Sequence, residues 1–135
     1  MQRVLSRTLL VLALFAAAGA PLALAQEPGI SPQGLALAIE NGQAPLILDV
    51  RTPEEFARGH VPGAILIPHD QLAERLSELG GATEVVLYCH SGRRATQVEG
   101  ILIDAGIGVS QIEGNWLGWQ AAGLDRKYPT AGADQ

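Results

Sequence analysis

Three short runs of residues are hydrophobic on both faces, and they constrain the fold of this chain more than any other feature. The runs are LILDV at residues 46–50, GAILIP at 63–68 and EVVLY at 84–88. Strands that are covered on both faces have continuous apolar sequences and occur mainly in parallel sheets, whereas half-exposed strands alternate apolar and polar residues. The runs therefore predict buried strands of a parallel sheet. A further strand is predicted in GVSQIEG at 108–114.

Segments with helical periodicity separate these runs. Ser31 followed by Pro32 is typical of an N-cap and a first helical position, and Asn41-Gly42 ends that helix. Further helices are expected in residues 52–60, 72–79 and 116–123. Another follows the Cys89 loop, where it buries Val98, Ile101, Leu102 and Ala105 and stops at Gly106. This alternation predicts an α/β fold with a central parallel sheet of about five strands and helices on both faces.

The first 25 residues have the pattern of a signal peptide. Arg3 and Arg7 give a positive start, the apolar stretch at 9–18 is too short to span a bilayer, and Ala23-Leu24-Ala25 is an A-x-A cleavage signal. We expect Sec-type export, cleavage after Ala25 and a periplasmic protein that has no further membrane contact. An uncleaved membrane anchor is the alternative, and the short apolar core argues against it.

The mature chain, Gln26 to Gln135, suits one domain. We expect a flexible N-terminus at 26–30, a single domain at 31–129 and a flexible C-terminus at 130–135. Loss of two of the nine basic residues leaves seven against fourteen acidic ones, a net charge of −7. This charge argues against nucleic acid and anionic membrane surfaces as partners. The sequence does not fix the oligomeric state, and we expect a monomer.

The single cysteine, Cys89, ends the third apolar run in YCHSGRRA, residues 88–95. One cysteine forms no internal disulfide, so this thiol is either buried and inert or functional. An ordinary thiol is mostly protonated at neutral pH. Here a turn with Gly92 leads into a helix N-terminus, whose N–H groups and dipole, together with Arg93 and Arg94, favour a thiolate and a bound oxyanion. Cys89 lies at the carboxyl end of a predicted parallel strand, where α/β sheets bind their ligands, so we favour a functional thiol over an inert one.

Three motifs in order resemble the rhodanese-type sulfurtransferases, most closely the small single-domain periplasmic ones. YCHSGRRA is similar to the family's active-site loop, with cysteine first, glycine fourth and arginine sixth. LILDVRTPEEFARGHVPGAILIP at 46–68 and IEGNWLGW at 112–119 are similar to its other two signatures. The resemblance implies that Cys89 takes sulfur from a small sulfur-anion donor such as thiosulfate and carries it as a persulfide. A thiol or cyanide is the acceptor, and neither a metal nor an organic cofactor is required.

By this resemblance Cys89 is catalytic, and the residues that bind the donor are His90, Ser91, Gly92, Arg93 and Arg94. His90 stands where many relatives have arginine, and it is either a general acid or base or a bystander, because attack by an existing thiolate needs no base. Arg94, the last loop residue, is expected to point inward and to matter more than Arg93. Asn115 replaces a glycine of the late motif, and asparagine tolerates the left-handed conformation that the turn needs.

Several charged residues near the strand ends are predicted to have structural roles. Asp49, Arg51 and Glu55 have the spacing of an ion-pair and hydrogen-bond brace beneath the loops, because charges just past a buried strand need partners. His60 is expected to fix a turn. The three histidines show no metal-ligand spacing, so no metal site is expected. Trp116 is expected to pack in the last helix or to line the pocket mouth.

Other functions fit the sequence less well. Cysteine-dependent phosphatases have five residues between cysteine and arginine, whereas four residues separate Cys89 from Arg94, which gives a smaller cradle. Non-catalytic binding domains of the same fold typically lack the cysteine. A thiol-disulfide oxidoreductase would need a second thiol. A redox-sensing single thiol stays open as an alternative.

Overall fold

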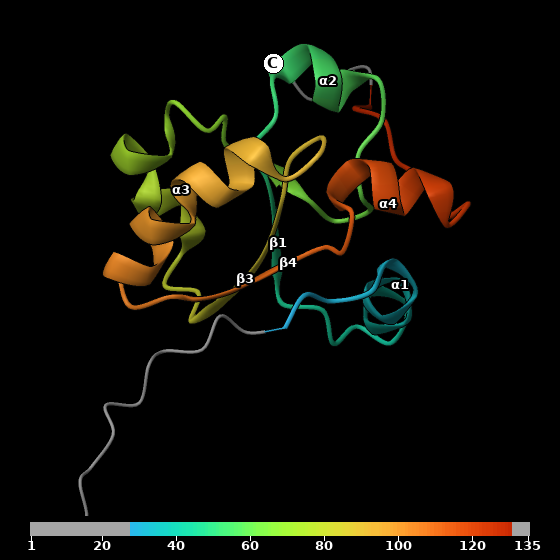
Figure 1. Ribbon diagram of the computed structural model, residues 1–135, viewed down its shortest axis with the longest axis horizontal. Helices are drawn as coiled ribbons and strands as arrows, with labels where there is room; N and C mark the ends of the chain where they lie inside the picture. The colour runs from blue at the N-terminus through green and yellow to red at the C-terminus, as the bar shows by residue number, and fades with distance from the viewer. Residues whose placement is uncertain (1–27, 131–135) are drawn as a thin grey trace, which may run out of the picture.

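Strands and helices alternate along the chain in the computed structural model, which describes residues 28–130 (Figure 1). The expected signal peptide at 1–25 and the last five residues, 131–135, lie outside the described residues. The elements in chain order are α1 Pro32–Glu40, β1 Leu46–Asp49, α2 Pro53–Ala57, β2 Ile65–Leu66, the 3₁₀ helices η1 Leu72–Glu74 and η2 Leu76–Leu79, β3 Glu84–Tyr88, α3 Arg93–Asp104, β4 Gly108–Gln111 and α4 Asn115–Ala121.

Within residues 28–130, the sheet has four parallel strands in the order β2-β1-β3-β4. We expected about five strands, and a fifth position is present only as an isolated parallel bridge between Ile30 and Ile112. Pro28 and Pro32 flank Ile30, and proline has no N–H to donate, so pairing at this edge ends after one residue. Ile30 nevertheless bonds on both sides, to the Gln111 carbonyl and the Glu113 N–H, so the paired structure begins one residue before the predicted domain start.

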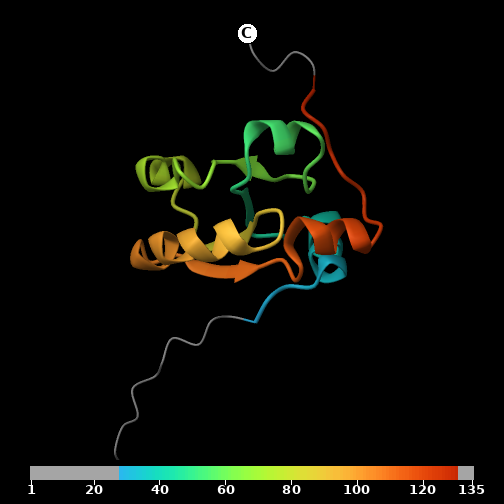
Figure 2. The same ribbon diagram turned by 45° about the horizontal axis from the view of Figure 1, so that its top comes forward.

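Helices cover both faces of the sheet, as predicted. Helices α1 and α4 lie side by side over one face, while α3 and the two 3₁₀ helices cover the other (Figures 1 and 2). Alternate residues of each strand enter two separate cores: Leu48 and Leu87 face the α3 side, whereas Ile47 and Val86 face the α1 side. Strands that are buried on both faces explain the continuous apolar runs in the sequence.

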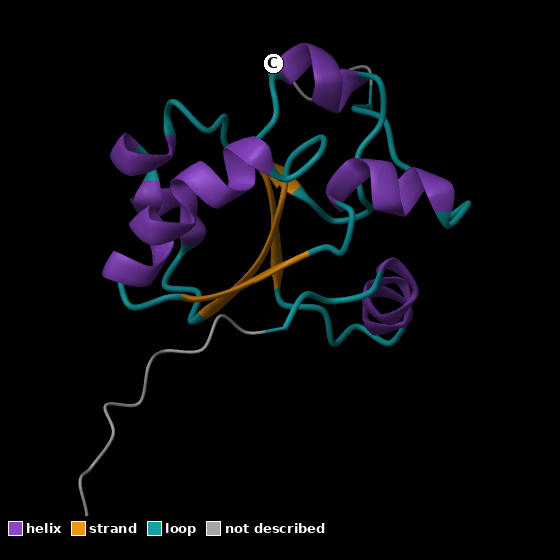
Figure 3. Ribbon diagram, in the orientation of Figure 1, coloured by secondary structure: helices purple, strands orange, loops and turns teal. Residues whose placement is uncertain are grey.

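The short helix α2 stands beyond the carboxyl end of β1, away from both layers (Figures 1 and 3). A capping box fixes its start, because Thr52 Oγ1 accepts the Glu55 N–H at 3.2 Å and a Glu55 carboxylate oxygen accepts the Thr52 N–H at 2.9 Å. Helix α2 and its capping carboxylate therefore lie at the edge where ligands bind in parallel sheets.

The helix predicted at 72–79 is instead two 3₁₀ turns that meet at Arg75. No side chain caps the N-terminus of either turn, and helices of this length have little stability of their own. Leu72 and Leu79 are buried in the α3-side core, so packing onto the sheet determines the path of this segment. Among residues 28–130, no helix has both the length and the apolar character needed to cross a membrane.

Candidate active site

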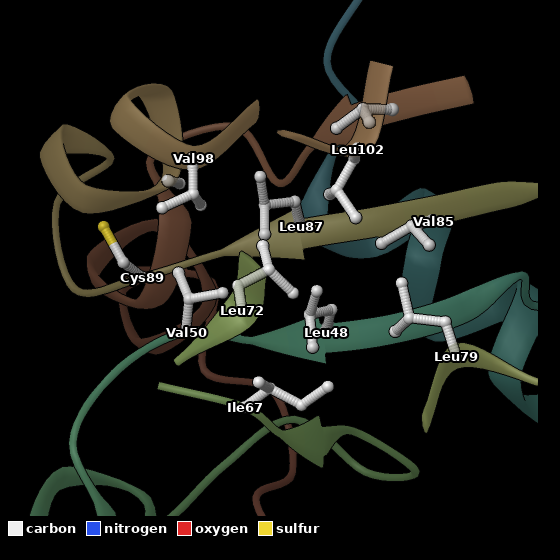
Figure 4. Close-up of a cluster of buried hydrophobic side chains, with 12 residues drawn as sticks. Leu48, Val50, Ile67, Leu72, Leu79, Val85, Leu87, Cys89, Val98 and Leu102 are labelled. Atoms are coloured by element: carbon white, nitrogen blue, oxygen red, sulfur yellow. The ribbon is translucent and has the colours of Figure 1, made fainter. Parts of the chain in front are cut away.

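Cys89 follows β3 directly, and only 1% of its surface is exposed. Its carbon atoms belong to the α3-side core, but its sulfur points away from the other side chains of that cluster (Figure 4). The Gly92 N–H donates to the sulfur at 3.0 Å across the turn. A thiolate accepts such a bond more strongly than a neutral thiol does. The turn therefore places a backbone donor directly against the sulfur.

Gly92 is both the fourth residue of the loop and the N-cap of α3, with φ at 104°. A side chain is strained at this backbone angle, so glycine is required for the chain to turn from β3 into α3. The first N–H groups of a helix have no partner within it and carry the positive end of its dipole. The twelve-residue helix α3 therefore presents a positive end to the loop that holds Cys89.

The residues expected to bind the donor divide into two groups. Gly92 and Arg94 lie close to the sulfur, since Gly92 donates to it and Cys89 is among the groups that act on Arg94. The side chains of His90, Ser91 and Arg93 are exposed.

Arg94 forms a two-pronged ion pair with Glu55. Its Nη1 and Nη2 atoms lie 2.7 and 2.9 Å from the two carboxylate oxygens. The Glu55 carboxylate, and to a smaller extent the Cys89 sulfur, raise the pKa of Arg94. In return, hydrogen bonding from Arg94 lowers the pKa of Glu55 from its usual value to about 2. Arg94 therefore stays charged and in place beside the loop.

The predicted ion-pair and hydrogen-bond brace of Asp49, Arg51 and Glu55 is divided between two ion pairs. Asp49 and Arg51 form a buried ion pair at 2.7 Å, but Glu55 binds Arg94 of the active-site loop instead. The cause is the capping box of α2, which holds the Glu55 carboxylate at the strand end where α3 also begins. Glu55 consequently belongs to the site, whereas Asp49 and Arg51 lie beneath it.

The Asp49–Arg51 pair connects several segments under the site. Arg51 Nη2 donates to the Gly59 carbonyl at 2.8 Å, and the guanidinium lies 4.5 Å from the ring centre of Trp116. Burial acts to lower the pKa of Arg51, yet its hydrogen bonds and proximity to Asp49 raise that pKa overall. Burial has the opposite effect on Tyr88, because it disfavours the charged phenolate and so raises the pKa. The Tyr88 hydroxyl accepts a hydrogen bond from the Val61 N–H. These groups keep fixed charge states and serve as structural supports.

His60 lies in a packed turn and is buried. Its ring stacks on Phe56 with the ring centres 3.7 Å apart, and its backbone pairs with Lys127 in an isolated antiparallel bridge. Within residues 28–130, no group of three histidine, cysteine or acidic side chains is arranged to hold a metal ion.

The start of α4 closes the site from the other side of the sheet. The Trp116 and Leu117 N–H groups donate to the carbonyls of Cys89 and His90, at 3.0 and 3.1 Å. A Cβ atom on Gly118 would lie 2.1 Å from the Glu113 carbonyl oxygen, so this close first turn depends on glycine. Trp116 is 4% exposed and packs in the core, so it does not form a pocket mouth.

Sequence reasoning missed the side chain that touches the loop most directly. Asn115 has a positive φ of 54°, as its replacement of glycine predicted. In addition, its Oδ1 atom accepts the Cys89 N–H at 2.9 Å. The sequence did hold a signal for this contact, because Asn115 places a polar side chain at a turn position that usually carries glycine.

The fold and the site together define a class of protein: an α/β domain with a buried cysteine in a loop between a parallel strand and a helix, where the cysteine sulfur accepts a backbone N–H. Comparison with known proteins is in agreement, because the family model described as a rhodanese-like domain matches residues 31–122. The chain therefore belongs to the rhodanese-like domain family.

Three relatives show the range of proteins that this chain is similar to. An HTH-type transcriptional regulator of Mycobacterium tuberculosis is 38% identical over 84% of the chain, which spans 50% of the regulator's length. A sulfurtransferase of Allochromatium vinosum is 33% identical over 70% of the chain and 90% of its own length. The crystal structure of a thiosulfate sulfurtransferase from Pseudomonas aeruginosa superposes with a TM-score of 0.64 at 31% identity, over 77% of this chain and 20% of that one. These relatives support sulfur transfer as the general chemistry.

Proposed function

We propose that this chain is a thiosulfate sulfurtransferase that carries sulfur as a persulfide on Cys89. The observation that carries the proposal is the Gly92 N–H directed at the Cys89 sulfur at 3.0 Å, inside a loop that ends at the charged Arg94. Preorganised donors of this kind stabilise an anionic sulfur in its starting and its persulfide form. The relative from Pseudomonas aeruginosa, named a thiosulfate sulfurtransferase, supports thiosulfate as the donor.

The first step is attack by the Cys89 thiolate on the outer sulfur of thiosulfate. A bond forms between the cysteine sulfur and that outer sulfur, while the bond from the outer sulfur to the sulfonate breaks and sulfite leaves with its electron pair. The negative charge on the product then lies on the terminal persulfide sulfur. The N–H groups at the start of α3 and the Arg94 guanidinium are the groups that stabilise it.

The second step returns the cysteine to its thiolate form. A nucleophilic acceptor, either cyanide or the thiolate of a small molecule or protein, attacks the terminal sulfur and leaves as thiocyanate or as a new persulfide. The bond between the two sulfurs breaks, and its electron pair stays on Cys89. No proton is required in either step, so His90, exposed at the loop, has no necessary role in proton transfer.

Intact mass after incubation with thiosulfate tests this function. We expect the chain to gain one sulfur atom, which cyanide removes as thiocyanate, and we expect Cys89→Ser to do neither while retaining its fold. A chain that gains no sulfur would leave the second candidate, a thiol-based sensing domain, which the similarity to a transcriptional regulator favours. Phosphatase activity at Cys89 would also overturn the proposal.

We further propose that the protein works in the periplasm after cleavage at Ala25. The positive start, the short apolar stretch and the A-x-A signal support this location. N-terminal sequencing of the exported protein is expected to start at Gln26. Recovery of uncleaved chain in the membrane fraction would contradict both the cleavage and the location.

A further inference from the structure

Asn115 makes contacts that a helix-starting residue does not need. It is the first residue of α4, 5% exposed, and its Oδ1 atom accepts the Cys89 N–H at 2.9 Å. Its Nδ2 atom donates to the Ile112 carbonyl at 3.3 Å and to Gln111 Oε1 at 3.4 Å. The side chain therefore joins the loop of the thiol to the end of β4 and the turn after it.

The backbone of Cys89 is bound on both sides by consecutive residues of α4. Its N–H goes to the Asn115 side chain, and its carbonyl accepts the Trp116 N–H at 3.0 Å. Both peptide planes next to the Cys89 Cα atom are thus fixed, and they set the direction of the Cα–Cβ bond that carries the sulfur. Of the two bonds, the one from Asn115 is made by a side chain and is open to substitution without a change in the backbone.

Asn115 also contacts a second residue of the same loop, Gly92. A Cβ atom on Gly92 would lie 2.9 Å from Asn115 Nδ2, so the amide fills the space beside the Gly92 backbone. Gly92 is the residue whose N–H donates to the sulfur at 3.0 Å. The Asn115 side chain consequently holds Cys89 by a hydrogen bond and Gly92 by packing.

We propose that Asn115 is a positioning residue that holds the Cys89 sulfur in line with the Gly92 N–H. The role in turnover rests on the proposed sulfur transfer, whereas the effect on the thiol does not. A neutral amide suits this task, since it accepts from the Cys89 N–H without placing negative charge beside a thiolate. A carboxylate at the same place would accept the same hydrogen bond but would repel that thiolate.

Two substitutions separate positioning from charge. Asn115→Gly tolerates the φ of 54° and removes the side chain. Asn115→Asp keeps the shape and the Oδ1 acceptor, adds a charge, and replaces the Nδ2 donor to Ile112 and Gln111 by an acceptor. Gln120→Ala, an exposed change on the same helix, is the matched control. The readouts are the pH midpoint of Cys89 alkylation by iodoacetamide, and kcat and KM for thiosulfate with cyanide as acceptor.

We expect Asn115→Gly to lower kcat about ten-fold or more with a much smaller change in KM, because a misplaced nucleophile slows attack more than binding. Asn115→Asp is expected to move the alkylation midpoint to higher pH by about one unit. Gln120→Ala is expected to match the wild type in both measurements.

Wild-type alkylation and wild-type kcat in both Asn115 variants would overturn the proposal. A lower melting temperature with an unchanged alkylation midpoint in Asn115→Asp would also overturn it, because that result describes a purely structural residue. If Asn115→Gly fails to fold, the aspartate variant decides through its midpoint. A wild-type protein that takes no sulfur from thiosulfate would defeat the proposed function, and the alkylation comparison would still decide the role of Asn115.

Discussion

Substitution of Gly92 by alanine tests the construction of the loop most directly. The residue has a φ of 104°, where a side chain is strained, and its new Cβ atom would lie 2.9 Å from Asn115 Nδ2. The backbone strain costs about 1–2 kcal/mol. Displacement of the Asn115 amide adds the loss of its hydrogen bond to the Cys89 N–H, about 0.5–1.5 kcal/mol. We therefore expect a loss of about 2–3 kcal/mol in the free energy of unfolding.

Gly106→Ala is the matched control for this substitution. Gly106 also has a positive φ, 79°, but a Cβ atom there would meet nothing within 4 Å. Its replacement is expected to cost only the backbone strain, about 1–2 kcal/mol. The difference between the two variants, about 1 kcal/mol, measures the contact with Asn115. In a domain of this size each kcal/mol lowers the melting temperature by roughly 4–8 °C.

Thermal unfolding and thiocyanate formation are the two assays for this pair. Gly92→Ala is expected to melt several degrees below Gly106→Ala and to lose roughly ten-fold or more of its activity, because its N–H no longer points at the sulfur. Gly106→Ala, which is remote from the loop, is expected to keep its activity. Equal melting temperatures together with wild-type activity in Gly92→Ala would refute the reasoning.

Two further predictions concern the ion pair beside the loop. Arg94→Ala is expected to reduce thiosulfate turnover more than Arg93→Ala, because Arg94 is fixed by Glu55 while Arg93 is exposed; equal steady-state rates at matched folding would show that the two arginines are equivalent. The Glu55 carboxylate, with a pKa of about 2 in the folded chain against an ordinary value of 4.5, contributes stability that is complete above pH 4.5 and is lost as the pH falls towards 2. Between pH 7 and 3, urea unfolding should show that the free energy of unfolding falls by up to about 1 kcal/mol more in the wild type than in Glu55→Gln. The expected difference is small because the ion pair is partly exposed and screened. Parallel pH profiles of the two proteins would contradict this prediction.

Much of the fold is predictable from local patterns. The apolar runs marked β1 and β3 because those strands are covered on both sides, whereas β2, at the edge of the sheet, is only partly buried. The Ser31-Pro32 pair marked the start of α1, where Ser31 Oγ accepts the Gly34 N–H. The predicted helix at 72–79 failed for a physical reason. Its leucine spacing reports burial against the sheet, and burial alone does not distinguish an α-helix from two 3₁₀ turns.

The partners of charged side chains were less predictable than the elements. Sequence proximity suggested that Glu55 joins Asp49 and Arg51, but its actual partner, Arg94, is 39 positions away. Such pairings depend on which strands are neighbours, and here β1 and β3 are adjacent in the sheet although β2 lies between them in the chain. The order of strands is a property of the whole fold, so a local pattern does not contain it.

The same strand order explains how support reaches the thiol. Asp49 ends β1 and Cys89 follows the adjacent strand β3, so a buried ion pair lies next to the nucleophile's strand. Arg51 continues this support, because its guanidinium lies over the ring of Trp116, and the Trp116 N–H binds the Cys89 carbonyl. Removing one member of a buried ion pair leaves an uncompensated charge and is strongly destabilising. Substitution of Asp49 or Arg51 would therefore affect the thiol loop indirectly, by destabilising the fold around it. Substitutions of Asn115, Gly92 or Arg94 act on the loop itself.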